Sequence, residues 1–366
     1  VEIDKADDQV GLPRMNECGE MVYSIGVIDL PGTAVFRYDN GLIEQLSDDP
    51  STPHVFPDIN SNGTVVWTRG WSGFGGGEIA MFERGVMTIL AEGSRATIND
   101  MVHIAFYKFE PVTCASESGV FFYDGETVDP IMDDGLSNQW AEINNLDDVV
   151  WTRKYSCANP WVADIMFWSD GRIIQLTDSA VQQNVPTVND LGHVAWQTAD
   201  SHHANYGIWK WEGDDPQLVI VAGQNPRLNN NGDMQFLRWD EGLSTWDTFV
   251  YIDGVEYQLT SETAWNIDGD INDWGEVVWH WALPPIFNGG IRHMRRIRTG
   301  EADFDGHIDL RDAAAFQNCM TGPGDFDGTV GGFDRLCDCR FLDIDHDRDV
   351  DRDDYALFAA AMTGPQ

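Results

Sequence analysis

The chain has 366 residues, enough for one large domain and a smaller one with a real hydrophobic core. Its 61 acidic residues outweigh 22 basic ones, and the formal net charge is −39. This charge argues against nucleic acid, an anionic membrane surface or a strongly anionic polysaccharide as a partner, because phosphate and other anions require basic patches. A calcium-binding protein or a salt-adapted surface fits better.

The sequence contains no run of about 18–20 apolar residues, so we expect no insertion into a membrane. It begins at Val1 rather than Met, which suggests that a leader was removed. Six cysteines, an even number without C-x-x-C spacing, indicate disulfides in an oxidising compartment. We therefore expect a secreted or cell-surface protein. The cysteines are Cys18, Cys114, Cys157, Cys319, Cys337 and Cys339.

A motif of about nine residues recurs seven times, as in "INSNGTVVW", "INNLDDVVW" and "INDWGEVVW". Each copy has an asparagine after an apolar residue, and a glycine follows three positions later, except where Val102 and Asp147 replace it. This spacing is typical of a turn. The residue at +5 is apolar and the residue at +7 is aromatic, which predicts a strand with one buried face. The asparagines are Asn16, Asn60, Asn99, Asn144, Asn189, Asn229 and Asn272.

A second pair of strands follows each motif, joined by an Asp-Gly, Asn-Gly or Arg-Gly turn, as in "DIMFWSDGRIIQLT". Four short strands in each of seven units predict a mainly β fold, a seven-bladed β-propeller over residues 1–297. The stretches "FPDINSNG" and "VPTVNDLG" resemble the blade turn of the TolB-like propeller family. The last blade has few residues for its outer strands, and the N-terminal "VEID" is a candidate to complete it.

No catalytic signature emerges from the propeller region: H-E-x-x-H, G-x-S-x-G and the P-loop are all absent. His202 and His203 are assigned to an exposed loop, and His103 and His193 to structural or surface positions. The tryptophans at +7 are expected to pack between blades. Others, which include Trp71, Trp140, Trp161, Trp239, Trp246, Trp265 and Trp281, leave a carbohydrate-stacking surface open.

The C-terminal region, residues 298–366, contains an acidic duplication with a shift of 42 residues: "EADFDGHIDLRD" aligns with "DIDHDRDVDRDD". Each twelve-residue loop has oxygen ligands at positions 1, 3, 5, 9 and 12, with a backbone carbonyl at position 7, which predicts an EF-hand-type Ca²⁺ site. The first set is Glu301, Asp303, Asp305, His307, Asp309 and Asp312. The second set is Asp343, Asp345, Asp347, Asp349, Asp351 and Asp354.

These duplicated loops, each followed by a stretch expected to form a helix of about ten residues, resemble a type I dockerin module over residues 301–366. The resemblance implies two Ca²⁺ ions and a cohesin-like protein partner. Two features depart from the family pattern. Arg348 replaces glycine at position 6 of the second loop, and the partner-selecting positions are Leu310-Arg311 in one copy and Arg352-Asp353 in the other.

Cys114 and Cys157 fall in the same loop of neighbouring repeats, and we expect them to form a disulfide. Cys319 is expected to pair with Cys337 or Cys339, and Cys18 either takes the remaining cysteine or is free.

Two functions remain open. The first, which we favour, is a non-catalytic secreted assembly protein whose C-terminal module docks onto a protein partner, either a cohesin-like scaffold or a neighbouring copy that extends a filament. The alternative is an extracellular carbohydrate-active enzyme, a polysaccharide lyase or glycoside hydrolase, carried by a dockerin. The small number of basic residues disfavours a lyase acting on an anionic sugar.

Overall fold

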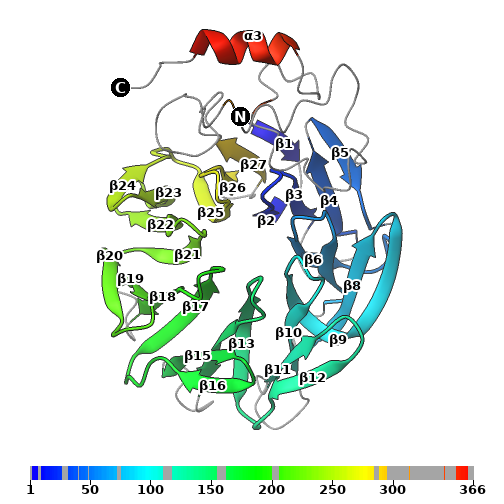
Figure 1. Ribbon diagram of the computed structural model, residues 1–366, viewed down its shortest axis with the longest axis vertical. Coiled ribbons are helices and arrows are strands. Elements are labelled where there is room, and N and C mark those ends of the chain that lie inside the picture. Colours follow the sequence, from blue (N-terminus) through cyan, green and yellow to red (C-terminus); the bar gives the residue numbers. More distant parts are fainter. Residues whose placement is uncertain are drawn as a thin grey trace. The chain divides into compact units, whose positions relative to one another are not determined.

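The computed structural model describes residues 2–6, 10–26, 32–39, 41–47, 49–71, 76–109, 118–154, 162–199, 206–283, 288–294, 313, 342 and 352–361. The chain divides into two compact units, Val1–Asn16 with Glu20–Met294, and Glu17–Gly19 with Arg295–Gln366. The first unit is mainly β and forms a propeller whose blades follow one another around a ring (Figure 1). Among the described residues no helix is long and apolar enough to span a membrane.

Each blade is an antiparallel sheet of four strands, as the repeat predicted. Blade 1 consists of β2 (Val10–Met15), β3 (Met21–Ile25), β4 (Ala34–Asp39) and β5 (Leu42–Gln45). Blade 2 consists of β6 (His54–Ile59), β7 (Val65–Arg69), β8 (Gly77–Glu83) and the first half of β9 (Val86–Ile98). Blade 3 consists of the second half of β9, β10 (Ile104–Phe109), β11 (Ser118–Tyr123) and β12 (Val128–Met132).

The remaining blades repeat the same order. Blade 4 consists of β13 (Ser137–Ile143), β14 (Val149–Lys154), β15 (Ala163–Ser169) and β16 (Arg172–Gln175). Blade 5 consists of β17 (Gln182–Val188), β18 (Val194–Ala199), β19 (Gly207–Trp211) and β20 (Gln217–Val221). Blade 6 consists of β21 (Gln224–Leu228), β22 (Met234–Asp240), β23 (Thr245–Ile252) and β24 (Val255–Gln258).

Blade 7 is completed by the N-terminus. Its strands are β25 (Trp265–Ile271), β26 (Val277–Leu283), β27 (Asn288–Met294) and β1 (Glu2–Ala6). Strand β1 pairs antiparallel with β27, with Ala6 opposite Gly289. The N-terminal "VEID", which was only a candidate to complete this blade, contributes to β1, and this pairing covers the otherwise open edge of β27.

The repeat asparagines join the blades into a closed ring, which we call the asparagine belt. Each side chain donates from Nδ2 to the backbone carbonyl of the next repeat asparagine, from Asn16 to Asn60 and onward to Asn272. Asn272 in turn donates to the carbonyl of Asn16. All seven are buried, with at most 4% of each side chain exposed, so the belt fixes both the number of blades and their closure.

The turn predicted after each asparagine forms in every repeat. All seven residues at +3 have positive φ, including the two that are not glycine, Val102 and Asp147, at 64° each. For a β-branched residue such as valine this conformation is strained. The turn is held by the asparagine Oδ1, which accepts backbone N–H groups such as those of Leu146 and Asp148.

The aromatic residues at +7 are all buried and pack between blades, as expected. The four tryptophans among them each donate Nε1–H to a side chain six residues before the repeat asparagine: Trp67 to His54, Trp151 to Asn138, Trp196 to Gln183, and Trp279 to Asn266. Where +7 is phenylalanine, the partner position is glycine: a Cβ on Gly93 would lie 2.5 Å from the ring of Phe106. In blades 2, 3, 4, 5 and 7 the aromatic residue is therefore matched to the residue that faces it.

The second unit is described in α3 (Arg352–Ala361), in Glu17–Gly19 and at residues 313 and 342. The helix has the length expected after the second acidic loop, and its Asp354 and Phe358 are fully buried. Cys18, in the same unit, is disulfide-bonded. Its partner and the other predicted pairings, which involve Cys114, Cys157, Cys319, Cys337 and Cys339, lie outside the described residues.

Candidate functional site

Each inner strand of the propeller is interrupted by a β-bulge. In every blade the residue four positions before the repeat asparagine has a left-handed φ, between 43° and 59°, although none is glycine. Such a conformation costs about 1–3 kcal/mol per residue and tends to gather at functional sites. These residues, the bulge ring, are Leu12, Phe56, Arg95, Trp140, Val185, Asn225 and Asp268.

All seven residues of the bulge ring line one cavity, about 500 Å³ in volume, in the middle of the propeller. This is the size of a small-molecule site. The asparagine belt repeats one residue seven times, whereas the bulge ring has seven different residues at equivalent positions. The side chains that line the cavity therefore differ from blade to blade, although the backbone at the bulge has the same conformation in each.

Neighbouring blades hold the bulges in place. The backbone N–H of Arg95 donates to Thr68 Oγ1 at 2.8 Å, and that of Asn225 donates to Gln197 Oε1 at 2.9 Å. Both acceptors lie on the second strand of the preceding blade. The strained backbone is thus held by buried side chains of the preceding blade, which keeps the cavity wall rigid.

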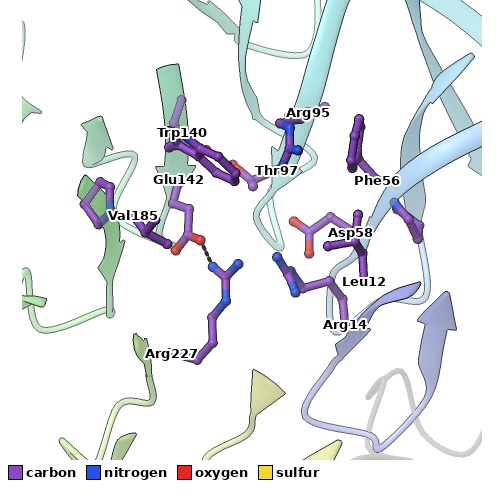
Figure 2. A pocket seen from close by; sticks show the side chains of 14 residues that line it. Leu12, Arg14, Phe56, Asp58, Arg95, Thr97, Trp140, Glu142, Val185 and Arg227 are labelled. Atoms are coloured by element: carbon purple, nitrogen blue, oxygen red, sulfur yellow. Dashed lines mark hydrogen bonds and ion pairs between the residues drawn. The ribbon is translucent and has the colours of Figure 1, made fainter. Parts of the chain in front are cut away.

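Arg95 lies between two aromatic rings. Its Cζ is 3.8 Å from the centroid of Phe56 and 4.1 Å from that of Trp140, so cation–π contact covers both faces of the guanidinium (Figure 2). Burial lowers the pKa of Arg95, while the nearby Tyr107 partly offsets this. Within the described part of the chain, no carboxylate forms an ion pair with it.

The residues two positions before each repeat asparagine form a second ring, and several of them contact other blades. Glu142 of blade 4 forms an ion pair with Arg227 of blade 6 (Figure 2). Asp58 accepts the backbone N–H of Ile98, and Asp270 accepts that of Met15, each from the next blade around the ring. The members are Arg14, Asp58, Thr97, Glu142, Thr187, Arg227 and Asp270.

Burial dominates the electrostatics of the second ring. It raises the pKa of Asp58 to about 6, although the positive charge of Arg14 and the N–H of Ile98 both act in the opposite direction. It lowers the pKa of Arg227 to about 10, and Arg14 adds to this shift. Arg14 lies beside Asp58 in Figure 2. The second ring is thus nearly balanced in charge within a strongly acidic chain.

The wall opposite Arg95 is polar. Asn225 on blade 6 and Asp268 on blade 7 are each three blades away from Arg95, and His280 on β26 lines the same side of the cavity. His280 is 9% exposed, and its Nε2 is buried without a hydrogen-bond partner among the described residues. Burial lowers its pKa to about 4, so the imidazole is neutral at neutral pH.

The predicted calcium ligands fall almost entirely outside the described residues. Asp354, the exception, lies in the first turn of α3 and is buried. Within the described ranges no three His, Cys, Asp or Glu side chains are arranged to hold a metal ion. The two calcium sites therefore stay predictions.

The tryptophans and histidines singled out from the sequence differ in where the structure places them. Trp71 and Trp140 both line the cavity. Trp239 and Trp246 instead pack edge to face on blade 6, and Trp281 is buried under Arg292. His103 contacts Asp147, 2.8 Å from Nδ1 to Oδ1, consistent with the predicted structural role. Trp161, His202 and His203 lie outside the described residues.

The fold is a closed seven-bladed propeller, and its central cavity has Arg95 on one side and polar, uncharged or acidic groups on the other. No protein-family model matches the sequence, and no curated protein does. Solved structures match the fold. The Pyrococcus horikoshii acylaminoacyl peptidase is 13% identical with a TM-score of 0.58, over 78% of this chain and 51% of that one. The chain thus spans about half the length of that peptidase.

The propeller domain of the trilobed protease from Pyrococcus furiosus, described as having an open velcro topology, has a TM-score of 0.58 at 12% identity, over 80% of this chain and 96% of that one. TolB from Acinetobacter baumannii matches at 10% identity with a TM-score of 0.48, over 71% of this chain and 65% of that one. At these identities the first two matches confirm the propeller fold alone.

Sequence reasoning missed the bulge ring and His280. The constant positions of the repeat predict its turns and strands, whereas the bulge position holds a different residue in each of the seven copies. The usable signal was this variation itself, at a fixed distance before a constant asparagine. His280 stands next to the aromatic residue at +7, in a strand that the repeat predicted correctly.

Proposed function

We propose that this chain is a secreted, non-catalytic assembly protein, in which a rigid propeller carries a calcium-dependent docking module at residues 298–366. The observation that carries the proposal is the placement of Asp354. It occupies position 12 of the second acidic loop, where an EF-hand-type site takes a ligand at the start of the following helix. It lies in the first turn of α3, and its side chain is fully buried.

A buried carboxylate at position 12 favours calcium ligation, because an EF-hand-type loop takes its last ligand there and directs it toward the bound ion. The first acidic loop repeats the same ligand spacing 42 residues earlier in the sequence. With a net charge of −39, copies of the chain repel one another. Calcium bound at the contact would reduce this repulsion, so association of the docking module with a protein partner is expected to depend on calcium.

The partner we propose is a protein, either a cohesin-like scaffold or a second copy of this chain. Self-association is the direct case to test, because it needs no unidentified component. The full chain is examined by mass photometry and negative-stain microscopy with calcium, and again after chelation. We expect assemblies with calcium, and single chains with a folded propeller without it.

The variant with Asp312→Ala and Asp354→Ala should behave as the chelated protein does, whereas Asp214→Asn, at an exposed carboxylate of the propeller, should not. If the full chain is a single particle with calcium, the cohesin-like partner remains and is tested by pull-down with an immobilised cohesin. If chelation leaves every intermolecular contact intact, or if the purified protein cleaves a neutral glycan, the proposal fails and the alternative, a carbohydrate-active enzyme, replaces it.

A further inference from the structure

We propose that the cavity inside the bulge ring binds a small polyhydroxylated carboxylate, with its carboxylate at Arg95 and its hydroxyl groups at the wall formed by Asn225, Asp268 and His280. All these residues belong to the propeller. The inference therefore goes beyond the proposed docking function and does not depend on the C-terminal module.

The carboxylate end is assigned by Arg95. Its two faces are covered by Phe56 and Trp140, so a ligand can meet only the N–H groups at its edge, one of which already donates to Tyr107. Two other arginines line the cavity, but Arg227 is already paired with Glu142, and Arg14 lies beside Asp58. A cationic ligand is disfavoured, because Arg95 itself occupies the space between the aromatic rings where such a cation would bind.

The hydroxyl end is assigned by the opposite wall. Asn225, Asp268 and a neutral His280 together offer donors and acceptors but no positive charge. A carboxylate placed there would be repelled by Asp268. The buried Nε2 of His280 has no partner within the described structure. A ligand hydroxyl would satisfy it, and a buried polar atom without a partner otherwise destabilises the folded protein.

The carbon skeleton of such a ligand would lie between these two ends. Leu12, Val185 and Trp71 supply apolar surface around the cavity. The volume of about 500 Å³ suits a ligand of one or two sugar rings in size. Arg95 at one end of the cavity and Asp268 at the other allow the ligand one orientation, because the reverse orientation would place its carboxylate against Asp268.

Three probes that share one pyranose skeleton test this assignment: D-galacturonate, D-galactose and D-galactosamine, which differ in charge. Each is titrated into the full chain by isothermal titration calorimetry in the presence of calcium. We expect D-galacturonate to bind at least about tenfold more tightly than D-galactose, and D-galactosamine to bind more weakly than either.

Variants locate the site. Arg95→Gln should weaken D-galacturonate binding at least about tenfold and remove the preference over D-galactose. The matched control is Arg238→Gln, since Arg238 also lies over two aromatic rings, Phe236 and Phe249, but does not line the cavity. Near-ultraviolet circular dichroism checks that each variant is folded.

If Arg95→Gln does not fold, Asn225→Asp provides the second test. It keeps the shape and the left-handed backbone preference of asparagine and adds a negative charge to the cavity, which should also weaken D-galacturonate binding. The inference is overturned if D-galacturonate does not bind at millimolar concentration, if D-galactose binds equally well, or if the folded cavity variants bind as the wild type does.

Discussion

The side-chain amide of Asn272 donates a hydrogen bond to the backbone carbonyl of Asn16, 3.3 Å away and 256 positions earlier in the sequence. It is the last link of the asparagine belt and the one that turns a row of repeats into a ring. Each link is buried, so every asparagine serves both its own turn and the next blade.

The asparagine belt predicts a large effect of one small substitution. Asn144→Ala removes the donor to Asn189 and the acceptor that holds Leu146 and Asp148. We expect the free energy of unfolding to fall by about 2–4 kcal/mol, because buried backbone groups lose their partners. Urea denaturation followed by tryptophan fluorescence measures this. Asn62→Ala, whose amide is exposed, should change stability by less than about 0.5 kcal/mol, and equal effects would contradict the role of the belt.

The pairing of Trp67 with His54 predicts coupling between the two side chains. The indole N–H donates to His54 Nδ1 at 2.8 Å, and both residues are buried. Trp67→Phe and His54→Val are each expected to destabilise the propeller, and the double variant should lose about 1–3 kcal/mol less than the sum of the two. A double-mutant cycle by urea denaturation measures the coupling, and strict additivity would show that the bond contributes nothing.

Closure of blade 7 by β1 predicts that the N-terminus stabilises the ring. Removal of residues 1–6 deletes the strand that pairs with β27 and exposes its edge. We expect a lower midpoint of thermal unfolding and a tendency to associate, as seen by differential scanning calorimetry and light scattering. Lys5→Ala keeps the backbone pairing and should leave both unchanged. A truncated chain as stable as the full one would show that β1 is dispensable.

The raised pKa of Asp58 predicts a pH-dependent cost. Folded Asp58 keeps its proton up to about pH 6, while the unfolded chain releases it near the usual value of 3.8. The folded state therefore binds more protons between these values, and stability contributed by this group falls as pH rises through that window. Asp58→Asn, which still accepts from Ile98, should match the wild type near pH 4 and exceed it by about 2–3 kcal/mol above pH 6.

Urea denaturation of both proteins across pH 4–8 measures the difference. Asp214→Asn makes the same change of charge at an exposed site and corrects for the large negative charge of the chain. A constant difference between Asp58→Asn and the wild type at all pH values would show that Asp58 titrates normally in the folded state.

Neighbouring carboxylates in α3 give a matched test of the proposed calcium sites. Asp354 is buried and Asp353 is exposed, although both lie in the first turn of the helix. Asp354→Asn should weaken calcium binding of the full chain at least about tenfold at one of the two proposed sites, because it removes a charged ligand. Asp353→Asn should change it little. Calorimetric titration with calcium distinguishes them, and equal behaviour would remove Asp354 from the ligand set.

The repeat itself was readable from sequence because it is local. An apolar residue, an asparagine, a turn and a strand of alternating residues follow one another within about ten positions, and each obeys short-range rules. Even Val102 and Asp147, which break the glycine pattern, adopt the expected turn because the asparagine side chain holds it. The number of blades followed from counting the copies of this repeat, whereas the sequence left open how the ring closes.

The channel site was decided only by the tertiary structure. Arg95, Trp140 and Asp268 lie far apart in the sequence and meet only because the belt closes into a ring. Their left-handed backbone has no local signature, since none is glycine and the support comes from neighbouring blades. Local turn and strand preferences determine each blade. The charged, buried and strained residues of the cavity come together only where the seven blades surround one axis.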